Sequence, residues 1–289
     1  MEKPSCLPTS SPHSSGGSAI ASRGGSADGV LLRATQDIRD GLARWRLWGL
    51  MGWQDILLRY RRSMLGPFWL TISMGIMVAA LGFLYGSLFK IPLDTYLPFL
   101  TLGFLVWTLI SGLITDGCTA LSASESFIKE VRLPYSLYVF RVIWRNMIIF
   151  GHNIVVYLVV AAIFGIKPSL ATLLVVPGLA LVMVNAVSVG LLASIVCARF
   201  RDVPQIVSSL LQIMFFLTPI IWQPELLKDR HFLVDSNPFY HFVQIIRAPL
   251  LGYPAQLESW LYAGGVSMLG WLLALLFLGR YRRFIPYWV

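Results

Sequence analysis

Charged side chains are scarce in this sequence, and acidic ones are the scarcest. Only 13% of the 289 residues are charged, with 14 Asp and Glu against 23 Lys and Arg, while 56% are hydrophobic. A soluble domain of this length could not bury so much apolar surface. The basic residues lie between long apolar runs rather than along one face, which argues against nucleic acid as a partner. The composition predicts an integral membrane protein surrounded by lipid.

Other absences exclude several kinds of chemistry. The three cysteines (Cys6, Cys118 and Cys197) are far apart and show neither a disulfide framework nor metal-ligand spacing. No GxxxxGK[ST] motif occurs and no Lys follows a Gly, so the chain has no ATP-phosphate loop, and we expect no cofactor or metal of its own. A passive channel and a membrane glycan-modifying enzyme remain as rival classes.

Six apolar runs are each long enough to cross roughly 30 Å of hydrocarbon. They cover about residues 67–89, 97–115, 138–164, 170–196, 203–222 and 260–278. An even number of crossings puts both termini on one side. Apart from the basic residues of the N-terminal tail, most Lys and Arg would lie on the side of the termini. The other side would hold only Lys90, Lys167, Lys228, Arg230 and Arg247. The positive-inside rule therefore predicts cytoplasmic termini.

Three regions follow from this pattern. Residues 1–35 begin with a Ser- and Gly-rich stretch and are expected to be a disordered tail. Residues 36–64 form a predicted amphipathic helix at the membrane interface, and residues 65–289 form the six-helix transmembrane domain. A solvated helix packed on the protein's own cytoplasmic surface is the alternative for the second region. Its candidate interface residues are Trp45, Trp48, Trp53, Arg59, Tyr60, Arg61 and Arg62.

The second cytoplasmic loop, residues 122–134, predicts a short helix. Ser122 and Glu125 have capping-box spacing, and Pro134 limits the helix to about two or three turns. Such a helix is too short to be stable alone, so we expect it to dock on a cytoplasmic partner; a lipid-facing connector is the alternative. The candidate docking residues are Ser122, Glu125, Phe127, Ile128, Lys129, Glu130, Val131 and Arg132.

A polar stripe runs along the fifth apolar run. Gln205, Ser208, Ser209 and Gln212 are spaced i, i+3, i+4 and i+7, which places them on one helical face. Polar groups in hydrocarbon need partners, so this face should meet water, substrate or another helix. The spacing leaves a substrate-lining wall and interhelical hydrogen bonding equally open.

The longest external connection, residues 223–258, contains a further predicted helix. Asn237 and Pro238 read as an N-cap followed by proline at the first helical position. The helix would be amphipathic and could be a re-entrant or interfacial element that closes an outer mouth; an inert surface loop is the alternative. The candidate gate residues are Asn237, Pro238, Phe239, Tyr240, His241, Gln244 and Arg247.

Five motifs in order carry a family resemblance. They are R-Y-R-R-S-M-L-G-P-F-W (59–69), I-K-E-V-R-L-P (128–134), R-V-I-W-R-N (141–146), R-F-R-D-V (199–203) and N-P-F-Y-H (237–241). With them the sequence resembles the permease subunit of type-2 ABC exporters for surface polysaccharide, and it is most similar to the Wzm O-antigen permeases. The Ser- and Gly-rich extension of residues 1–30 departs from that pattern.

The resemblance implies an all-α permease that pairs with a second copy of itself and with two ATP-binding subunits in the bacterial inner membrane. ATP and Mg would be bound by those partners. Residues 122–132 would be the coupling helix, the N-terminal amphipathic segment the interface helix, and residues 237–250 the periplasmic gate. The cargo would be O-antigen on an undecaprenyl diphosphate carrier, with capsular polysaccharide or teichoic acid as the alternative.

Aromatic side chains could line the path of such a cargo, because sugar rings pack their C–H faces on aromatic rings while polar groups meet the hydroxyls. The candidate aromatic residues, beside the stripe of residues 205–212, are Trp69, Phe83, Tyr85, Phe104, Trp107, Phe215, Phe216 and Trp222.

Overall fold

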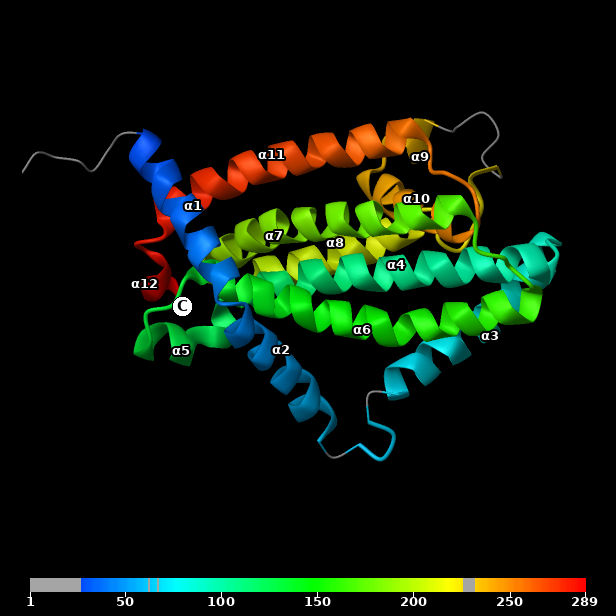
Figure 1. Cartoon of the computed structure of the whole chain (residues 1–289), viewed down its shortest axis with the longest axis horizontal. Coiled ribbons are helices and arrows are strands. Elements are labelled where there is room, and N and C mark those ends of the chain that lie inside the picture. Colours follow the sequence, from blue (N-terminus) through cyan, green and yellow to red (C-terminus); the bar gives the residue numbers. More distant parts are fainter. Residues whose placement is uncertain (1–26, 62, 67, 226–231) are drawn as a thin grey trace, which may run out of the picture.

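The structure, a computed structural model, describes residues 27–61, 63–66, 68–225 and 232–289, and all its regular elements there are helices (Figure 1). These are α1 (Ala27–Ala43), α2 (Trp45–Tyr60), α3 (Phe68–Phe89), α4 (Leu93–Thr119), η1 (Ser122–Ser124), α5 (Glu125–Glu130), α6 (Tyr135–Phe164), η2 (Leu170–Leu174), α7 (Val175–Arg199), α8 (Val203–Leu217), α9 (Phe232–Asp235), α10 (Pro238–Leu250), α11 (Leu257–Tyr281) and α12 (Ile285–Trp288).

Within the described ranges, five helical segments are long and apolar enough to span a membrane: α3, α4, α6, η2 with α7, and α11. The fifth expected crossing is shorter than the sequence suggests. Helix α8 has 15 residues and ends at Leu217, so it rises only about 22 Å, less than the roughly 30 Å of a bilayer core. It ends there because Thr218 precedes Pro219 and is extended, with φ −86° and ψ 134°. The prediction of six full-length crossings is therefore confirmed only for five.

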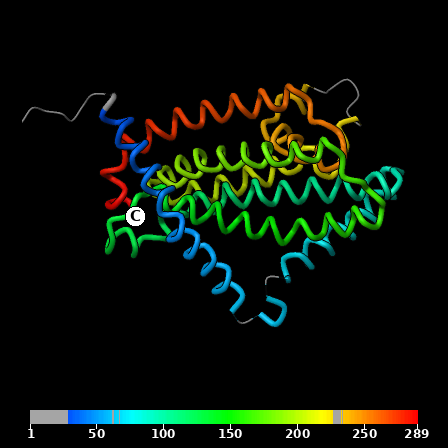
Figure 2. The backbone as a smooth tube through the Cα atoms, in the orientation of Figure 1, coloured from blue at the N-terminus to red at the C-terminus, as the bar shows by residue number. Residues whose placement is uncertain are grey.

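Helix α4 is the centre of the bundle and packs against α3, α6, α7, α8 and α10 (Figure 2). Glycines permit the closest approaches. A Cβ atom on Gly82 of α3 would lie 2.1 Å from Leu97 of α4, and one on Gly190 of α7 would lie 2.7 Å from Val139 of α6. These glycines serve contacts inside the chain, where small residues let helices approach each other.

The two ends of the bundle carry different elements. Helices α1, α5 and α12 lie at one end with the C-terminus, and α9 and α10 lie at the opposite end (Figure 1). The loop of residues 122–134 is therefore on the same side as both terminal helices, which the predicted topology requires.

The N-terminal region differs from its prediction in two ways. Residues 27–35, assigned by the sequence to the disordered tail, are helical because α1 packs against α6 and α11 and buries Ala34. The expected single helix of residues 36–64 is two helices, since Arg44 leaves the helical region with φ −87° and ψ 38°. Arg62, a predicted interface residue, lies outside the described residues.

Candidate functional site

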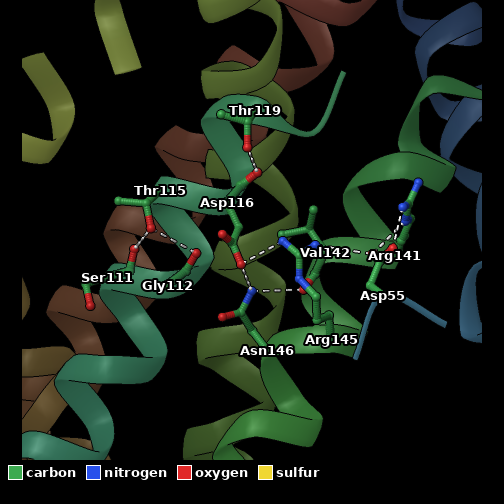
Figure 3. Close-up of polar contacts among 10 residues, drawn as sticks. All are labelled: Asp55, Ser111, Gly112, Thr115, Asp116, Thr119, Arg141, Val142, Arg145 and Asn146. Atoms are coloured by element: carbon green, nitrogen blue, oxygen red, sulfur yellow. Dashed lines mark hydrogen bonds and ion pairs between the residues drawn. The ribbon is translucent and has the colours of Figure 1, made fainter. Parts of the chain in front are cut away.

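A charged junction connects three helices near the end that carries α5 (Figure 3). It consists of Asp55 on α2, Asp116 on α4, and Arg141, Arg145 and Asn146 on α6. The Asp55 carboxylate accepts from Arg141 Nε at 2.8 Å and lies 3.2 Å from Arg145 Nη1. Asp116 Oδ2 lies 2.8 Å from Arg145 Nη2 and accepts from Asn146 Nδ2, also at 2.8 Å. Arg145 thus bridges the carboxylates of α2 and α4.

Helical spacing explains how α6 can serve both neighbours. Arg141 and Arg145 are four residues apart and share a face, and Asn146 is one step further around the helix. Asp55 turns toward α6, because two guanidinium groups lie opposite it, and its side chain is only 13% exposed.

The aromatic face of α2 is divided between the protein and its surroundings. Trp48 packs on Phe140 and Trp144 of α6, with ring centroids 6.0 Å apart in each pair. Trp45 and Trp53 are exposed, as are Arg59 and Arg61, while Tyr60 is half-buried. One side of α2 therefore packs on α6, and the other presents indole rings and cations outward, as a helix at a membrane interface would.

The predicted capping box of the loop at residues 122–134 is wrong. Ser122 lies in η1, and its hydroxyl donates back to the Thr119 carbonyl at 3.2 Å because the chain leaves α4 without straightening. Helix α5 begins at Glu125 and ends at Glu130, shorter than expected, with Val131 already extended. A hydrogen bond from Lys129, together with its positive charge, lowers the pKa of the Glu125 carboxyl.

Most of the candidate docking side chains of residues 122–132 are available to a partner. Phe127 is 46% exposed and Val131 48%, and the side chains of Ser122, Glu125, Lys129, Glu130 and Arg132 are also exposed. Ile128 alone turns inward, where it packs on the core cluster that includes Leu121 and Leu137. The short helix is thus held by one anchor and projects apolar and charged groups from the end of the bundle.

A groove of about 570 Å³ runs between α4 and α8; we call it the pathway groove. It is lined by Trp107, Thr108, Ser111, Gly112, Thr115, Ser208, Leu211, Gln212, Phe215 and Phe216. The predicted stripe on α8 is exposed along its length, and two of its members, Ser208 and Gln212, line the groove. The opposing hydroxyls of Thr108, Ser111 and Thr115 were missed, although their i, i+3, i+7 spacing matches the rule that identified the α8 stripe.

Five of the eight candidate aromatics lie at or near this groove. Trp107, Phe215 and Phe216 line it, Phe104 contacts Phe215 with ring centroids 5.5 Å apart, and Trp222 Nε1 donates to the Phe216 carbonyl at 3.0 Å. The structure does not bring the other three there. They belong to α3, which packs on α4 and α6. On α3, Trp69 and Phe83 are exposed, and Tyr85 stacks on Phe89.

Helix α10 begins as the sequence predicts. Asn237 Oδ1 accepts from the Phe239 amide at 3.0 Å, and Pro238 takes the first helical position. The alternative of an inert surface loop is wrong, because α10 packs against α4, α7 and α11 and buries most of its length. His241 is also buried, where it contacts Ser259 Oγ at 3.0 Å and the Asp235 carbonyl at 2.7 Å.

Arg247 fastens α10 to the chain that follows α8. Arg247 is 2% exposed, and its guanidinium donates to the Pro219 carbonyl at 2.7 Å and to Gln244 Oε1 at 3.0 Å. It also lies 4.0 Å from the ring centroid of Phe99, a cation–π distance. Tyr240 packs beside His241, with centroids 5.4 Å apart. The hydrogen bond from the buried Arg247 to the Pro219 carbonyl therefore connects α10 to the end of α8.

Comparison with known proteins shows the family of this chain. The family model described as "ABC-2 type transporter" matches residues 46–251, which run from α2 through α10. The chain belongs to the ABC-2 type transporter family. Proteins of this family are the membrane components of ABC transporters, in which a separate subunit supplies ATP hydrolysis. The resemblance inferred from the five motifs is confirmed at this level.

Curated relatives of this ABC-2 chain carry a common name. An "O-antigen export system permease protein RfbA" of Klebsiella pneumoniae is 24% identical over 187 residues, covering 64% of this chain and 72% of the relative. A protein of the same name from Myxococcus xanthus is 23% identical over 188 residues, with the same coverage.

In the described part of the chain, no three His, Cys, Asp or Glu residues gather as metal ligands would.

Proposed function

We propose that this ABC-2 chain is the permease of an exporter that moves undecaprenyl-linked O-antigen polysaccharide across the bacterial inner membrane. Two copies would form the path, and two ATP-binding subunits, holding ATP and Mg, would drive it. The observation that carries the proposal is the pathway groove. Its walls combine hydroxyl and amide groups with aromatic rings, which suits sugar hydroxyls and the C–H faces of sugar rings, and the curated relatives are named for O-antigen export.

The second copy would complete the path. Helix α8 exposes Ile206, Leu210 and Ile213 as well as its polar stripe, so the described part of the chain covers this helix on one side only. A polysaccharide in transit needs polar surroundings on all sides in the membrane. Two grooves facing each other across a twofold axis would supply them, and α8 with the residues up to Trp222 would form the sixth crossing.

Helix α5 would receive the motion of the ATP-binding subunit, with both termini in the cytoplasm. The charged junction would transmit it, because Asp55 and Arg145 connect α2 to α6 and Asp116 connects α6 to the groove wall α4. At the opposite end α10 would act as the gate, with Arg247 tying it to the residues after α8. Rigid helices joined in this way favour a two-state rearrangement.

A substitution in the groove tests this function. In cells that lack the native protein, Ser208→Leu should abolish export of surface polysaccharide, because the larger apolar side chain fills the groove and removes a hydroxyl from its wall. The readouts are surface glycan and lipid-linked glycan retained inside the cell. Ser87→Leu on α3 is the control, since Ser87 is also an exposed serine in a spanning helix but lies outside the groove.

The control should export at the wild-type level with equal protein in the membrane. Wild-type export by Ser208→Leu would contradict the assignment of the groove, and normal surface glycan with no retained lipid-linked glycan in cells lacking the protein would contradict the cargo.

A further inference from the structure

A second hollow lies away from the pathway groove, where α1, α5, the end of α11 and α12 meet. We call it the basic groove; it holds about 670 Å³ and no residue of α4 or α8 lines it. Its basic lining residues are Arg33, Lys129, Arg132, Arg280, Arg282 and Arg283. Among the residues that the structure describes, no Asp or Glu lines the groove, so its described lining carries charge of one sign.

Two of these cations are neutralised by neighbours. Lys129 pairs with Glu125 on α5, and Arg282 pairs with the buried Asp37 at 3.2 Å. Within the described ranges, the other four form no ion pair with a carboxylate. Arg33 Nε donates only to the Gly29 carbonyl, at 3.0 Å, and Arg283 lies over the ring of Phe284 at 4.7 Å. Unpaired guanidinium groups around one hollow favour an anion with several acceptor oxygens.

The same groove joins an apolar surface. On α11, Leu272 and Leu276 are exposed, and Arg280 follows them at four-residue steps, so all three share one face. Helix α11 is long and apolar enough to span a membrane. The groove therefore opens where the lipid-exposed face of a spanning helix ends, with apolar side chains such as Ile128 and Pro286 in its wall.

We propose that the basic groove binds the phosphate headgroup of an anionic phospholipid whose acyl chains lie along α11. Basic pockets at the ends of membrane helices bind such headgroups. Continuity with the apolar face of α11 favours a lipid over an acidic peptide, which would need no apolar surface leading into the membrane. The bound headgroup would tie α1 to α5 and α11, and thus the N-terminal helix to the element that we expect to meet the ATP-binding subunit.

Lipid retention by the full chain tests the proposal. The purified protein in neutral detergent is mixed with phosphatidylglycerol or phosphatidylcholine, and bound lipid is counted by native mass spectrometry. We expect saturable retention of phosphatidylglycerol and not of phosphatidylcholine. The double variant Arg280→Gln/Arg283→Gln should bind phosphatidylglycerol about thirtyfold more weakly, the factor for two basic residues near an anionic surface.

The control is Arg39→Gln/Arg44→Gln, which removes two exposed cations at the end of α1 that do not line the groove. It should retain the lipid as the wild type does. Equal loss in both variants, or none in either, would overturn the site. Binding of inorganic phosphate or of a poly-glutamate peptide to the groove without retention of phosphatidylglycerol would overturn the lipid as its occupant.

Discussion

At the scale of single residues, buried charge is the least expected feature of this protein. Asp37 is 1% exposed, yet it accepts from the amides of Tyr135 and Ser136 at 3.2 and 3.0 Å and pairs with Arg282. It thereby caps the N-terminus of α6, where a carboxylate is favourable because free amides point at it. Asp55 has a comparable role at the charged junction, where it pairs with Arg141 and also with Arg145, which pairs with Asp116 as well.

Asp55→Asn should lower the free energy of unfolding by about 3 kcal/mol, because it leaves two poorly exposed guanidinium groups short of a carboxylate. The thermal unfolding midpoint in detergent should fall by several degrees. Asp40→Asn is the matched control, since Asp40 is exposed on α1 and forms no ion pair within the described part of the chain. Equal midpoints for the two variants would show that the junction contributes nothing to stability.

At the scale of elements, one glycine decides how α1 crosses the bundle. A Cβ atom on Gly279 of α11 would lie 2.4 Å from both the Cγ1 and the carbonyl oxygen of Val30. Backbone cannot yield as a flexible side chain can, so any larger residue must move α1. Helix α1 also carries Asp37, and its displacement would remove the cap of α6.

Gly279→Ala should therefore destabilise the protein and expose α1 to protease. Gly265→Ala, on the same helix, has nothing within 4 Å of its added Cβ and should stabilise the chain by up to about 1 kcal/mol through helix propensity. Limited proteolysis and thermal unfolding of the two variants separate these effects. Cleavage of α1 at the same rate in both would mean that the contact with Val30 does not hold α1 in place.

At the scale of the whole molecule, the two ends of the bundle should face different compartments. Helix α5 lies with α1 and α12 at one end, and the start of α11 lies with α9 and α10 at the other (Figure 1). In the proposed function, this separation would let the ATP-binding subunit act at the end that carries α5 and α10 act as the gate at the opposite end.

Cysteine labelling checks this arrangement. With the natural cysteines replaced by serine, Ser126→Cys on α5 should react with a membrane-impermeant maleimide only in inverted vesicles. Glu258→Cys, in the first turn of α11, should react only in intact cells. Both positions have exposed side chains, so access depends on the side of the membrane. Labelling of both from one side would contradict the proposed topology.

The local features of the protein follow from short stretches of its sequence. Continuous apolar runs predicted five of the spanning helices, because a helix must satisfy its own backbone in lipid. The Asn237–Pro238 pair predicted the start of α10, and the spacing from Gln205 to Gln212 predicted that these polar side chains share one face of a helix. Each signal comes from residues within a few turns of one another.

The contacts between distant groups, in contrast, come from the packing of the helices. Asp55 and Arg141 are 86 residues apart, and Arg282 and Asp37 are still further apart, so no periodicity relates them. The capping box at Ser122 failed for a local reason: the chain leaves α4 without straightening, so the Ser122 hydroxyl donates to the Thr119 carbonyl three residues earlier. Pairing across helices depends on how the bundle packs, whereas the helices depend on their own sequence.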